Sequence, residues 1–288
     1  MIVLVTGAGG RTGQAIVPAL IHAGHTVRIL SRRTELGGPW AQIAAERRQG
    51  DLGKDADVAA ALRGVDALYH IPPNMNPQEV AFGKRLVALA QQAKLKHIVY
   101  HSVLHPQIQA LPHHWNKVFV EEAVLESGLN FTILQPSSYM QNVLQDWEGI
   151  TQRGVHTLGF SVQAKLALVD LDDVAAVAAK VVGNPDHFGA VYELAGPEML
   201  SGEDKARILS QVLGRAVRAA EEALADFRRR ALAAGMPSHV VETRASMFAH
   251  YDHQGLVGNA NVLRWVLGRA PATFESFLRR GSTGSPRG

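Results

Sequence analysis

The sequence of 288 residues contains no cysteine. This absence excludes a disulfide framework, a zinc or iron–sulfur centre held by cysteine, and a thiol nucleophile. Long hydrophobic runs are also missing, since no stretch approaches the roughly 18 apolar residues that indicate a membrane span. Met1 is followed directly by the apolar run Ile2–Val5 and a glycine-rich segment, with none of the three regions of a secretory signal. We therefore expect a cytoplasmic protein that does not contact a membrane.

The chain also lacks a large excess of either positive or negative charge. The chain has 29 Lys and Arg against 26 Asp and Glu, a net charge of +3, and no long basic block. These numbers favour no nucleic-acid partner. The histidines are scattered and H-E-x-x-H is absent, so we expect no metal site. G-x-S-x-G is absent too, which argues against a hydrolase. The hydrophobic content of 47% nevertheless indicates a globular chain with a sizeable core.

Short apolar runs alternate with helical patterns over the first two-thirds of the chain. The predicted strands are Ile2–Thr6, Thr26–Leu30, Arg47–Gln49, Ala67–Ile71, His97–His101, Phe131–Leu134, Leu166–Val169 and Val191–Leu194. The predicted helices are Arg11–Ala23, Asp55–Leu62, Pro77–Gln92, His113–Ser127 and Asp172–Val182. Several strands are continuous Val/Ile/Leu runs, as expected when both faces of a sheet are covered. The pattern predicts an α/β fold with a doubly wound parallel sheet.

The composition of the chain changes at two places. Residues 141–162 are mixed and rich in glycine, and after Gly196-Pro197 the chain becomes mainly helical. We therefore assign 1–140 and 163–196 to the domain with the sheet, and 141–162 and 197–288 to a smaller lobe. The Gly/Ser/Pro-rich tail 281–288 is predicted to be mobile.

A glycine-rich loop joins the first predicted strand to the first predicted helix. Its spacing is Gly7-x-x-Gly10-x-x-Gly13, whereas the register from Gly7 through Gly9 ends on Thr12 and does not complete G-x-G-x-x-G. It is no P-loop either, because no Gly-Lys-Ser/Thr follows. Glycines here permit close approach of a pyrophosphate, which the bare N–H groups of the helix attract. The expected dinucleotide contacts are Thr6, Gly7, Gly9, Gly10, Arg11, Thr12 and Gly13.

The residues after the second and third strands bear on the choice of dinucleotide. The second strand ends in Leu30-Ser31-Arg32-Arg33, where an acidic residue would bind the ribose of NAD. Arg32, and next Arg33, suit a 2′-phosphate, so we predict NADP(H) in preference to NAD(H). The alternative is a solvated pair of surface arginines. Asp51 and Leu52 follow the third strand and suit contact with the adenine, although Asp51 could equally cap a turn.

Ligands of such sheets lie at the carboxyl ends of the strands. Three loops leave the predicted sheet there, and their expected cofactor contacts are Ile71, Pro72, Pro73, Ser102, Pro136 and Ser137. The expected substrate contacts are Asn74, Tyr139, Met140, Asn142, Trp147 and Phe160. Core packing explains the apolar members of the second set equally well.

The ordered motifs resemble those of a known family. They are Gly7-x-x-Gly10-x-x-Gly13, Gly50-Asp51-Leu52, His97–Val103, and Lys117 followed by Glu121-Glu122 and Gly128–Pro136. Together with Val169–Ala175 and Tyr192–Gly196 they resemble the NmrA-like group of atypical short-chain dehydrogenase/reductases, over about residues 1–200. The resemblance implies a Rossmann-type sheet, a C-terminal substrate lobe and NADP(H). Some members of the group reduce quinones, triphenylmethane dyes or phenylpropanoid-like compounds, and others are cofactor-binding redox sensors.

The resemblance also points to the residues that carry chemistry. Lys117 lies where the reductases carry a lysine, which could bond the nicotinamide ribose and supply or relay a proton. The alternative is a surface lysine paired with Glu121 one turn on. The tyrosine of Tyr-x-x-x-Lys is replaced by His113, whose imidazole would be a proton donor near neutral pH if unperturbed. Ser102 matches the family's serine, and Tyr139 is a second candidate donor.

We accordingly expect an NADPH-dependent reductase of a small apolar acceptor such as a quinone, a dye or an enone. The rival hypothesis is a redox-sensing regulator that binds NADP(H) without turnover, and only this hypothesis requires a protein partner. An epimerase is a third hypothesis, against which the missing tyrosine argues. A homodimer is compatible with the sequence. Asp170 and Asp173 are interpreted as caps of the helix that starts there.

Overall fold

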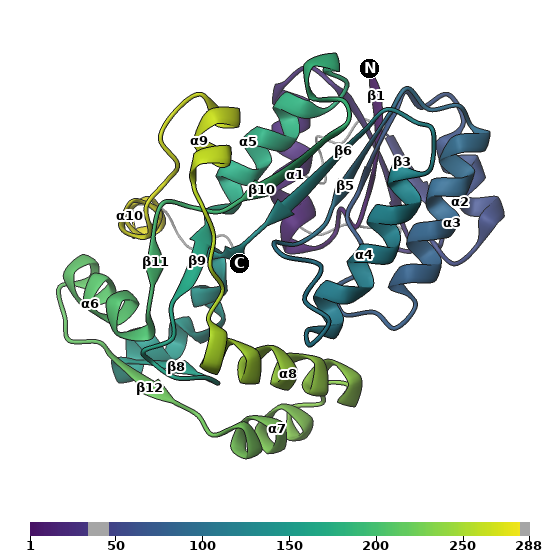
Figure 1. Ribbon diagram of the computed structural model, residues 1–288. Coiled ribbons are helices and arrows are strands. Elements are labelled where there is room, and N and C mark those ends of the chain that lie inside the picture. The colour runs from purple at the N-terminus through teal and green to yellow at the C-terminus, as the bar shows by residue number, and fades with distance from the viewer. Residues whose placement is uncertain (34–45, 283–288) are drawn as a thin grey trace. The chain divides into compact units, whose positions relative to one another are not determined.

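The computed structural model describes residues 1–33 and 46–282, and the chain folds into two compact units (Figure 1). The first unit contains residues 1–108, 113–135 and 174–192, and the second contains 109–112, 136–173 and 193–288. Within the described ranges, no helix is long and apolar enough to cross a membrane.

The first unit is built on a seven-stranded sheet with the order β10-β6-β5-β4-β1-β2-β3. Its strands are β1 (Ile2–Thr6), β2 (Thr26–Ser31), β3 (Glu46–Gln49), β4 (Ala67–His70), β5 (His97–His101), β6 (Phe131–Pro136) and β10 (Ala190–Leu194). The pairings from β3 across to β6 are all parallel. The carboxyl ends of these strands therefore meet at one edge, which is where the predicted site residues follow β1, β2, β4 and β5.

Among the described residues, five α-helices lie between or beside these strands. They are α1 (Arg11–His22), α2 (Asp55–Leu62), α3 (Glu79–Gln92), α4 (Pro112–Leu125) and α5 (Leu171–Val181). Helices α2, α3 and α4 cover one face of the sheet, and α1 and α5 cover the other (Figure 1). Gly83 of α3 lies against α4, since a Cβ at this position would be 2.6 Å from a methyl group of Val120. The two helices therefore pack closely only because residue 83 has no side chain.

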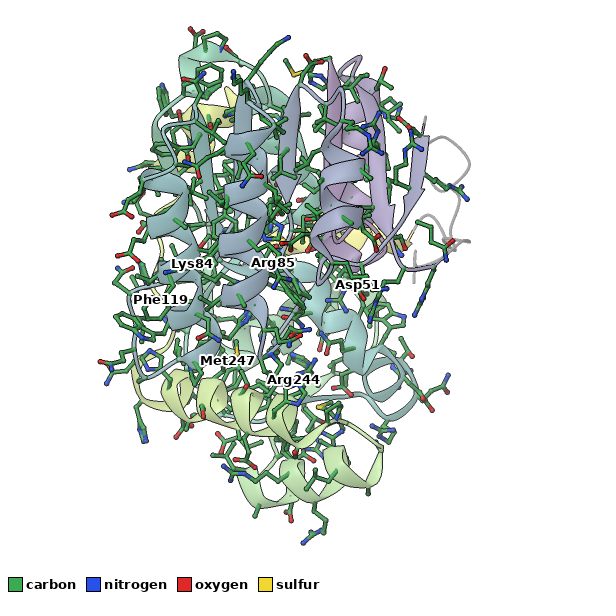
Figure 2. The ribbon with its side chains drawn as sticks, turned by 90° about the vertical axis from the view of Figure 1, so that its right-hand side faces the viewer. Asp51, Lys84, Arg85, Phe119, Arg244 and Met247 are labelled. Atoms are coloured by element: carbon green, nitrogen blue, oxygen red, sulfur yellow. The ribbon has the colours of Figure 1, made fainter. Side chains whose placement is uncertain are left out.

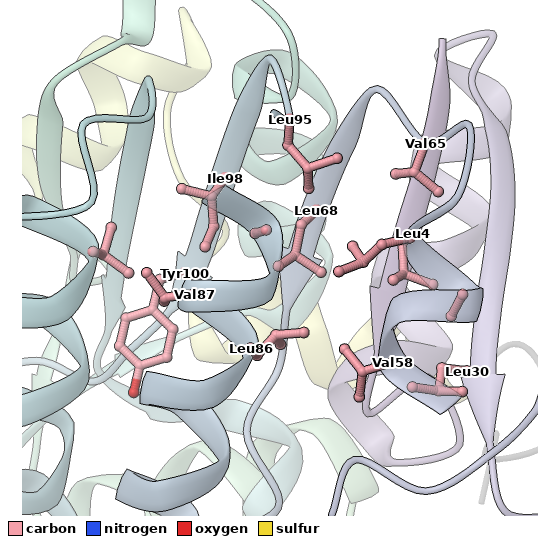
Figure 3. Packing of buried hydrophobic residues seen from close by; sticks show 14 of the residues in the cluster. Leu4, Leu30, Val58, Val65, Leu68, Leu86, Val87, Leu95, Ile98 and Tyr100 are labelled. Carbon is pink, nitrogen blue, oxygen red and sulfur yellow. The ribbon is translucent and has the colours of Figure 1, made fainter. Parts of the chain in front are cut away.

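The core under α2, α3 and α4 follows the two periodicities of the sequence. Alternate strand residues such as Leu4, Leu68 and Ile98 meet helix residues such as Leu62 and Leu86 in one buried cluster (Figure 3). Burying each of these side chains contributes about 1.5–3 kcal/mol. The predicted doubly wound sheet is confirmed, and the observed strands and helices of this unit agree with the predicted ones to within about two residues at each end.

In its described residues, the second unit holds two small sheets and the five α-helices α6 to α10. A three-stranded sheet has the order β11-β9-β7, and β12 pairs with β8. The strands are β7 (Ser138–Tyr139), β8 (Val155–Leu158), β9 (Leu166–Val169), β11 (Met199–Leu200) and β12 (Arg218–Glu221). The helices are α6 (Gly202–Leu213), α7 (Leu224–Ala233), α8 (Ser238–Gln254), α9 (Asn261–Leu267) and α10 (Phe274–Ser282). The chain beyond residue 200 is mainly helical, as the composition predicts.

Two details of this unit differ from the predictions. Leu166–Val169 is a strand, but it pairs with β7 and β11 and not with the seven-stranded sheet, so residues 163–173 group with the second unit. An apolar run of four residues gives no information about which sheet it joins. The predicted tail starts at Gly281, but α10 continues to Ser282, and residues 283–288 lie outside the described part of the chain.

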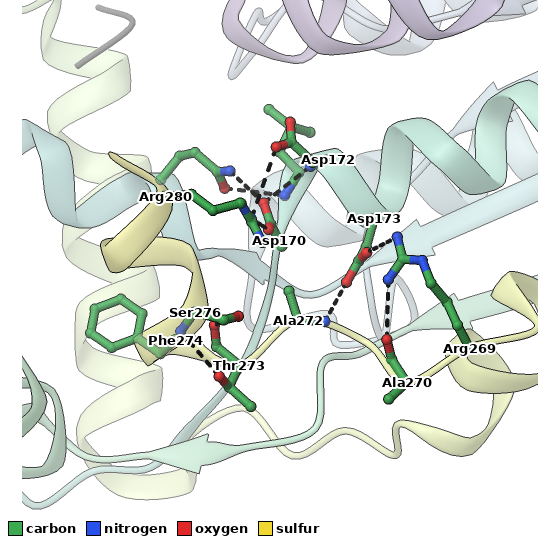
Figure 4. A network of polar contacts seen from close by, with 12 residues as sticks. Asp170, Asp172, Asp173, Arg269, Ala270, Ala272, Thr273, Phe274, Ser276 and Arg280 are labelled. Carbon is green, nitrogen blue, oxygen red and sulfur yellow. Dashed lines mark hydrogen bonds and ion pairs between the residues drawn. The ribbon is translucent and has the colours of Figure 1, made fainter. Parts of the chain in front are cut away.

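The two aspartates at the start of α5 have different roles (Figure 4). Asp170 Oδ1 accepts a hydrogen bond from the backbone N–H of Asp172 at 3.1 Å, as expected for a cap, and Asp170 also pairs with Arg280. Asp173 instead accepts from Arg269 Nη2 at 2.6 Å and from the backbone N–H of Ala272 at 2.7 Å. The interpretation of Asp173 as a cap is therefore wrong: its carboxylate holds the segment between α9 and α10.

Candidate functional site

The glycine loop turns sharply between β1 and α1. Gly7 has φ +67°, and a Cβ there would lie 2.6 Å from the carbonyl oxygen of Ile71. A Cβ on Gly13 would lie 2.4 Å from the backbone of Ala8. Side chains at these two positions would push β1, the loop and the residue after β4 apart. Gly7 and Gly13 are therefore required by the fold of the loop.

Gly10 differs from its two partners because its surroundings are open. A Cβ on Gly10 would lie 3.5 Å from the carbonyl oxygen of Gly7, an ordinary contact, and the φ of −85° suits any residue. Gly10 is the N-cap of α1, provides no side-chain cap, and the first turn has no acidic residue. The N–H groups at this exposed helix start therefore carry the positive end of the helix dipole, which favours a phosphate.

Thr6 and the residues after β4 form the floor under this loop. The hydroxyl of Thr6 lies 2.7 Å from His70 Nδ1 and accepts from the backbone N–H of Ile71 at 3.2 Å. This hydroxyl is buried and is used within the fold. Pro72 and Pro73 follow, half-buried, and Asn74 is exposed. Met75 then adopts φ +53°, which is uncommon for a residue with a long side chain.

The residues predicted to bind the adenosine end follow β2 and β3. Arg32 and Arg33 are exposed directly after β2. The carboxylate of Asp51 accepts from the backbone N–H of Gly53 at 2.8 Å, so it caps a turn, and Leu52 beside it is half-buried. Arg85 of α3 donates to the carbonyl oxygen of Gly53 at 2.8 Å and steadies the same loop (Figure 2). The turn-cap interpretation of Asp51 is confirmed by this contact, and contact with the adenine stays a prediction.

Lys117 is buried in an ion pair. Its Nζ lies 2.5 Å from Oε1 of Glu79, and the two side chains are only 4% and 1% exposed. The idea that Lys117 is a surface lysine paired with Glu121 is therefore wrong. Glu79 is the first residue of α3, the helix that follows the loop after β4, and it is buried. The fold thus holds one ammonium group in place at the carboxyl edge of the sheet.

A second polar group lies beside it. The Ser102 hydroxyl donates to Glu121 Oε1, and the side-chain amide of Gln135 donates to both carboxylate oxygens at 2.9 and 3.1 Å. Ser102 directly follows β5, and Gln135 lies near the end of β6. Partial burial raises the pKa of Glu121, against the opposing effects of these two hydrogen bonds and of the Lys117 charge.

The histidines around Lys117 are neutral near pH 7. Burial, and then the charge of Lys117, lowers the pKa of His70 to about 3 and that of His101 to about 3. The same two causes, followed by His114, hold the pKa of His113 well below its usual value. A neutral imidazole is a poor proton donor. The condition for His113 as a proton donor was an unperturbed imidazole, and its lowered pKa opposes that role.

The remaining predicted residues belong to the second unit. Met140 is buried, the Ser137 hydroxyl has no hydrogen-bond partner among the described residues, and Asn142 Nδ2 donates to Ser138 at 3.3 Å. Phe160 packs on Phe248 and Tyr251, with ring centroids 5.8 and 5.7 Å away. Pro136 is the last residue of β6, Tyr139 ends β7, and Trp147 follows the short helical segment Met140–Asp146. Phe160 is thus part of an aromatic cluster, as the core interpretation allowed.

Two residues of the site were not predicted as functional. Glu79 gave no signal in the sequence, because its partner Lys117 is 38 positions away. Glu121 enters the sequence analysis as part of a family motif and as a surface partner of Lys117, without a role of its own, although its position four residues after Lys117 places both on one face of α4. The available signal was the pair of polar residues one turn apart, on the face of α4 that also carries Val120 and Val124.

The sheet order and the open helix start after its first strand define a nucleotide-binding protein of the Rossmann type. The chain belongs to the NmrA-like family, whose model matches residues 1–277. Relatives are the NAD(P)H azoreductase of Xenophilus azovorans, 29% identical over 96% of this chain and 97% of that protein, and quinone oxidoreductase 2 of Escherichia coli, 27% identical over 96% and 97%. A (4-alkanoyl-5-oxo-2,5-dihydrofuran-3-yl)methyl phosphate reductase of Streptomyces griseus is 34% identical over 84% of each chain.

Solved structures agree with this assignment. The E. coli NADPH-dependent quinone oxidoreductase complexed with NADPH superposes with a TM-score of 0.84 at 25% identity, covering 96% of this chain and 99% of that one. A triphenylmethane reductase of Citrobacter sp. has a TM-score of 0.86 at 20% identity, covering 99% and 100%, and supports the fold alone. The family and the class of oxidoreductase predicted from the sequence are thus confirmed.

Proposed function

We propose that this protein is an NADPH-dependent reductase that transfers a hydride to a small apolar acceptor such as a quinone, a dye or an enone. The observation that carries the proposal is the buried Lys117–Glu79 pair, at the same sheet edge as the open start of α1. The named relatives are reductases of quinones, of azo compounds and of an unsaturated lactone phosphate. Lys117 stands where the family's reductases carry a lysine, and a buried ammonium in a fixed position suits binding and proton transfer.

The residues present fit a dinucleotide. The close contacts behind Gly7 and Gly13 keep the loop tight, while the space over Gly10 and the bare N–H groups of α1 leave room and positive potential for a pyrophosphate. The exposed Arg32 after β2 would meet a 2′-phosphate, which supports NADPH over NADH. Bound NADPH would supply the hydride.

The chain's own residues then have separate tasks. The loop at Gly7–Gly13 and Arg32 bind and orient the cofactor, with Ile71, Pro72 and Pro73 along the end of β4. Lys117 holds a positive charge at the reacting end, where it stabilises negative charge that develops on the acceptor. Ser102 offers a hydroxyl beside it. We assign cofactor binding to the first unit, and the predicted acceptor contacts Tyr139, Met140, Asn142 and Trp147 stay predictions.

The first experiment measures NADPH oxidation against a panel of quinones, azo and triphenylmethane dyes and enones. We expect turnover by the wild type, and a fall of kcat of about 10²-fold or more in Lys117→Met with little change in the Kd for NADPH. Lys84→Met is the matched control, because Lys84 lies on the neighbouring helix with its side chain 48% exposed. Equal turnover in Lys117→Met and the wild type would show that Lys117 takes no part in the reaction.

The cofactor site is tested separately with Gly10→Asp. An aspartate is a favoured N-cap and fits the open space at this position, so the stability of the fold should be unchanged or slightly higher. Its negative charge lies where the pyrophosphate would bind, so the Kd for NADPH should rise at least about tenfold. Gly10→Ser is the uncharged control. Arg32→Ala should weaken NADPH binding and leave NADH binding unchanged, and equal losses for both would refute the assignment of Arg32.

The lowered pKa of His113 and the missing tyrosine of Tyr-x-x-x-Lys favour one second candidate, the cofactor-sensing regulator. A sensor would bind NADPH tightly, reduce nothing in the panel, and bind a protein partner with an affinity that depends on the redox state of the cofactor. Turnover of any acceptor at a rate that falls in Lys117→Met would exclude this alternative.

A further inference from the structure

The reduction of a quinone or an enone consumes a proton as well as a hydride, and the structure points to where that proton comes from. The usual tyrosine is replaced by His113, and burial keeps that imidazole neutral near pH 7. Lys117 is engaged by Glu79. A further polar group at this edge of the sheet is the set Ser102, Glu121 and Gln135, in which Ser102 donates to Glu121.

The hydrogen bonds of this set depend on the charge of Glu121. A serine hydroxyl has one proton to donate. While Glu121 is ionised, Ser102 donates that proton to Oε1, and the hydroxyl can only accept from any other group. Once Glu121 is protonated, its own O–H can donate to the serine oxygen, and the Ser102 proton becomes available to an acceptor. The protonation state of Glu121 therefore decides whether Ser102 can act as a donor.

We propose that Glu121 is the positioning residue that keeps the Ser102 hydroxyl supplied with a proton, in place of the missing tyrosine. The acceptor gains two electrons and one hydrogen as the hydride from bound NADPH, and one proton from Ser102. In this step the Ser102 O–H bond breaks and an O–H bond forms on the acceptor, while the proton of Glu121 moves to the Ser102 oxygen. Glu121 is left as a carboxylate, and because it is only partly buried, water can protonate it again.

The surroundings support this arrangement. Partial burial raises the pKa of Glu121, which makes the protonated form more accessible than at the surface. The charged and titratable groups that face it are Lys117 on its own helix and Tyr100 on β5, whose own pKa is raised well above its usual value by burial and by Glu79 and Glu121. Gln135 faces it from β6 with neutral N–H donors. Glu79 offsets the charge of Lys117 and so weakens the effect by which this cation favours ionised Glu121.

This inference rests on the proposed reductase function, so its first test needs no turnover. The infrared band of the protonated carboxyl group of Glu121 is followed against pH in the protein without cofactor, as the difference between the wild type and Glu121→Gln. We expect a midpoint above 4.5, and a higher midpoint in Ser102→Ala, because that variant removes a donor to the carboxylate. A midpoint at or below 4.5, or one that Ser102→Ala leaves unchanged, would overturn the proposal.

The second test is the pH profile of kcat/KM with any acceptor that the wild type reduces. The rate should fall as the pH rises through the midpoint of Glu121, both in the wild type and in Glu122→Gln, whose carboxylate is 58% exposed and pairs with Lys84. Glu121→Gln should lose at least about 10²-fold and show no such fall, while NADPH binding is kept. Glu121→Asp should restore the pH dependence in part. A profile in Glu121→Gln equal to that of the wild type would refute the proposal.

If the wild type reduces nothing in the panel, the proposed function is refuted, but the infrared titration of Glu121 can still be carried out and interpreted. The infrared titration then decides alone: a raised midpoint that moves in Ser102→Ala supports a proton shared between Ser102 and Glu121, and any other result refutes it.

Discussion

Separating the buried ion pair should destabilise the protein strongly. Glu79 and Lys117 are 1% and 4% exposed, so removing either charge leaves the other without its partner in a site that water barely reaches. Breaking such a pair from one side costs about 3–5 kcal/mol. We therefore expect this loss in Glu79→Gln and in Lys117→Met. In the double variant no uncompensated charge is left, so its loss should be smaller than the sum of the two single losses by about 2–3 kcal/mol.

Urea unfolding followed by circular dichroism measures these free energies. Because the chain has two compact units, unfolding in two steps is expected, and hydrogen exchange of the β4 and β5 amides assigns the loss to the first unit. The matched control is the pair of Lys84 and Glu122, which are 3.7 Å apart, and 48% and 58% exposed. Its removal should cost at most about 1 kcal/mol. Losses below about 1 kcal/mol in the Glu79 and Lys117 variants, or losses that simply add, would refute the reasoning.

Two further results are expected. Asp173→Ala removes the acceptor for Arg269 and for the backbone N–H of Ala272 (Figure 4). The substitution should lower the free energy of unfolding by about 1–3 kcal/mol and speed proteolysis of the segment between α9 and α10. Equal proteolysis of the variant and the wild type would contradict this role. The neutral buried histidines should make stability depend on pH. Burial lowers the pKa of His70 from 6.5 to about 3 and that of His97 from 6.5 to about 4. At a pH between 6.5 and each lowered value, the unfolded chain therefore binds more protons than the folded chain. Their contribution is complete above pH 6.5 and is lost as the pH falls toward 4, with a slope of about 1.4 kcal/mol per pH unit for each histidine. His97→Asn should reduce the slope measured by urea unfolding, and an unchanged slope would show that His97 is not the group responsible.

The glycine loop shows what the spacing of residues along the chain can predict and what it cannot. Gly7-x-x-Gly10-x-x-Gly13 predicted a tight turn before a helix, and the turn is there, with Gly7 at φ +67° and Gly13 against Ala8. The spacing did not reveal that the three glycines differ. Gly7 and Gly13 are required because backbone approaches them from behind, whereas Gly10 has open space, and only the folded chain distinguishes the two cases.

Lys117 shows that the residue pattern within one helix does not predict the partner of a buried charge. Its spacing to Glu121 suggested an exposed pair one turn apart, but helix α4 turns both residues inward, and Glu79 at the start of α3 takes the lysine. Glu121 is left to Ser102 and Gln135, which are 19 and 14 positions away. No periodicity within one helix contains that information.

The sequence by itself determined the elements of the first unit, the strand-end positions of the site residues and the family. These follow from interactions between neighbours in the chain: the alternation of apolar residues, the places where glycine permits a turn, and helix starts. The tertiary structure alone decided that β9 joins a separate sheet, that Asp173 holds the segment before α10, and that Lys117 pairs with Glu79. A buried charge takes the partner that the packing brings within a few ångströms, because leaving it unpaired costs several kcal/mol, and distance along the chain does not enter that choice.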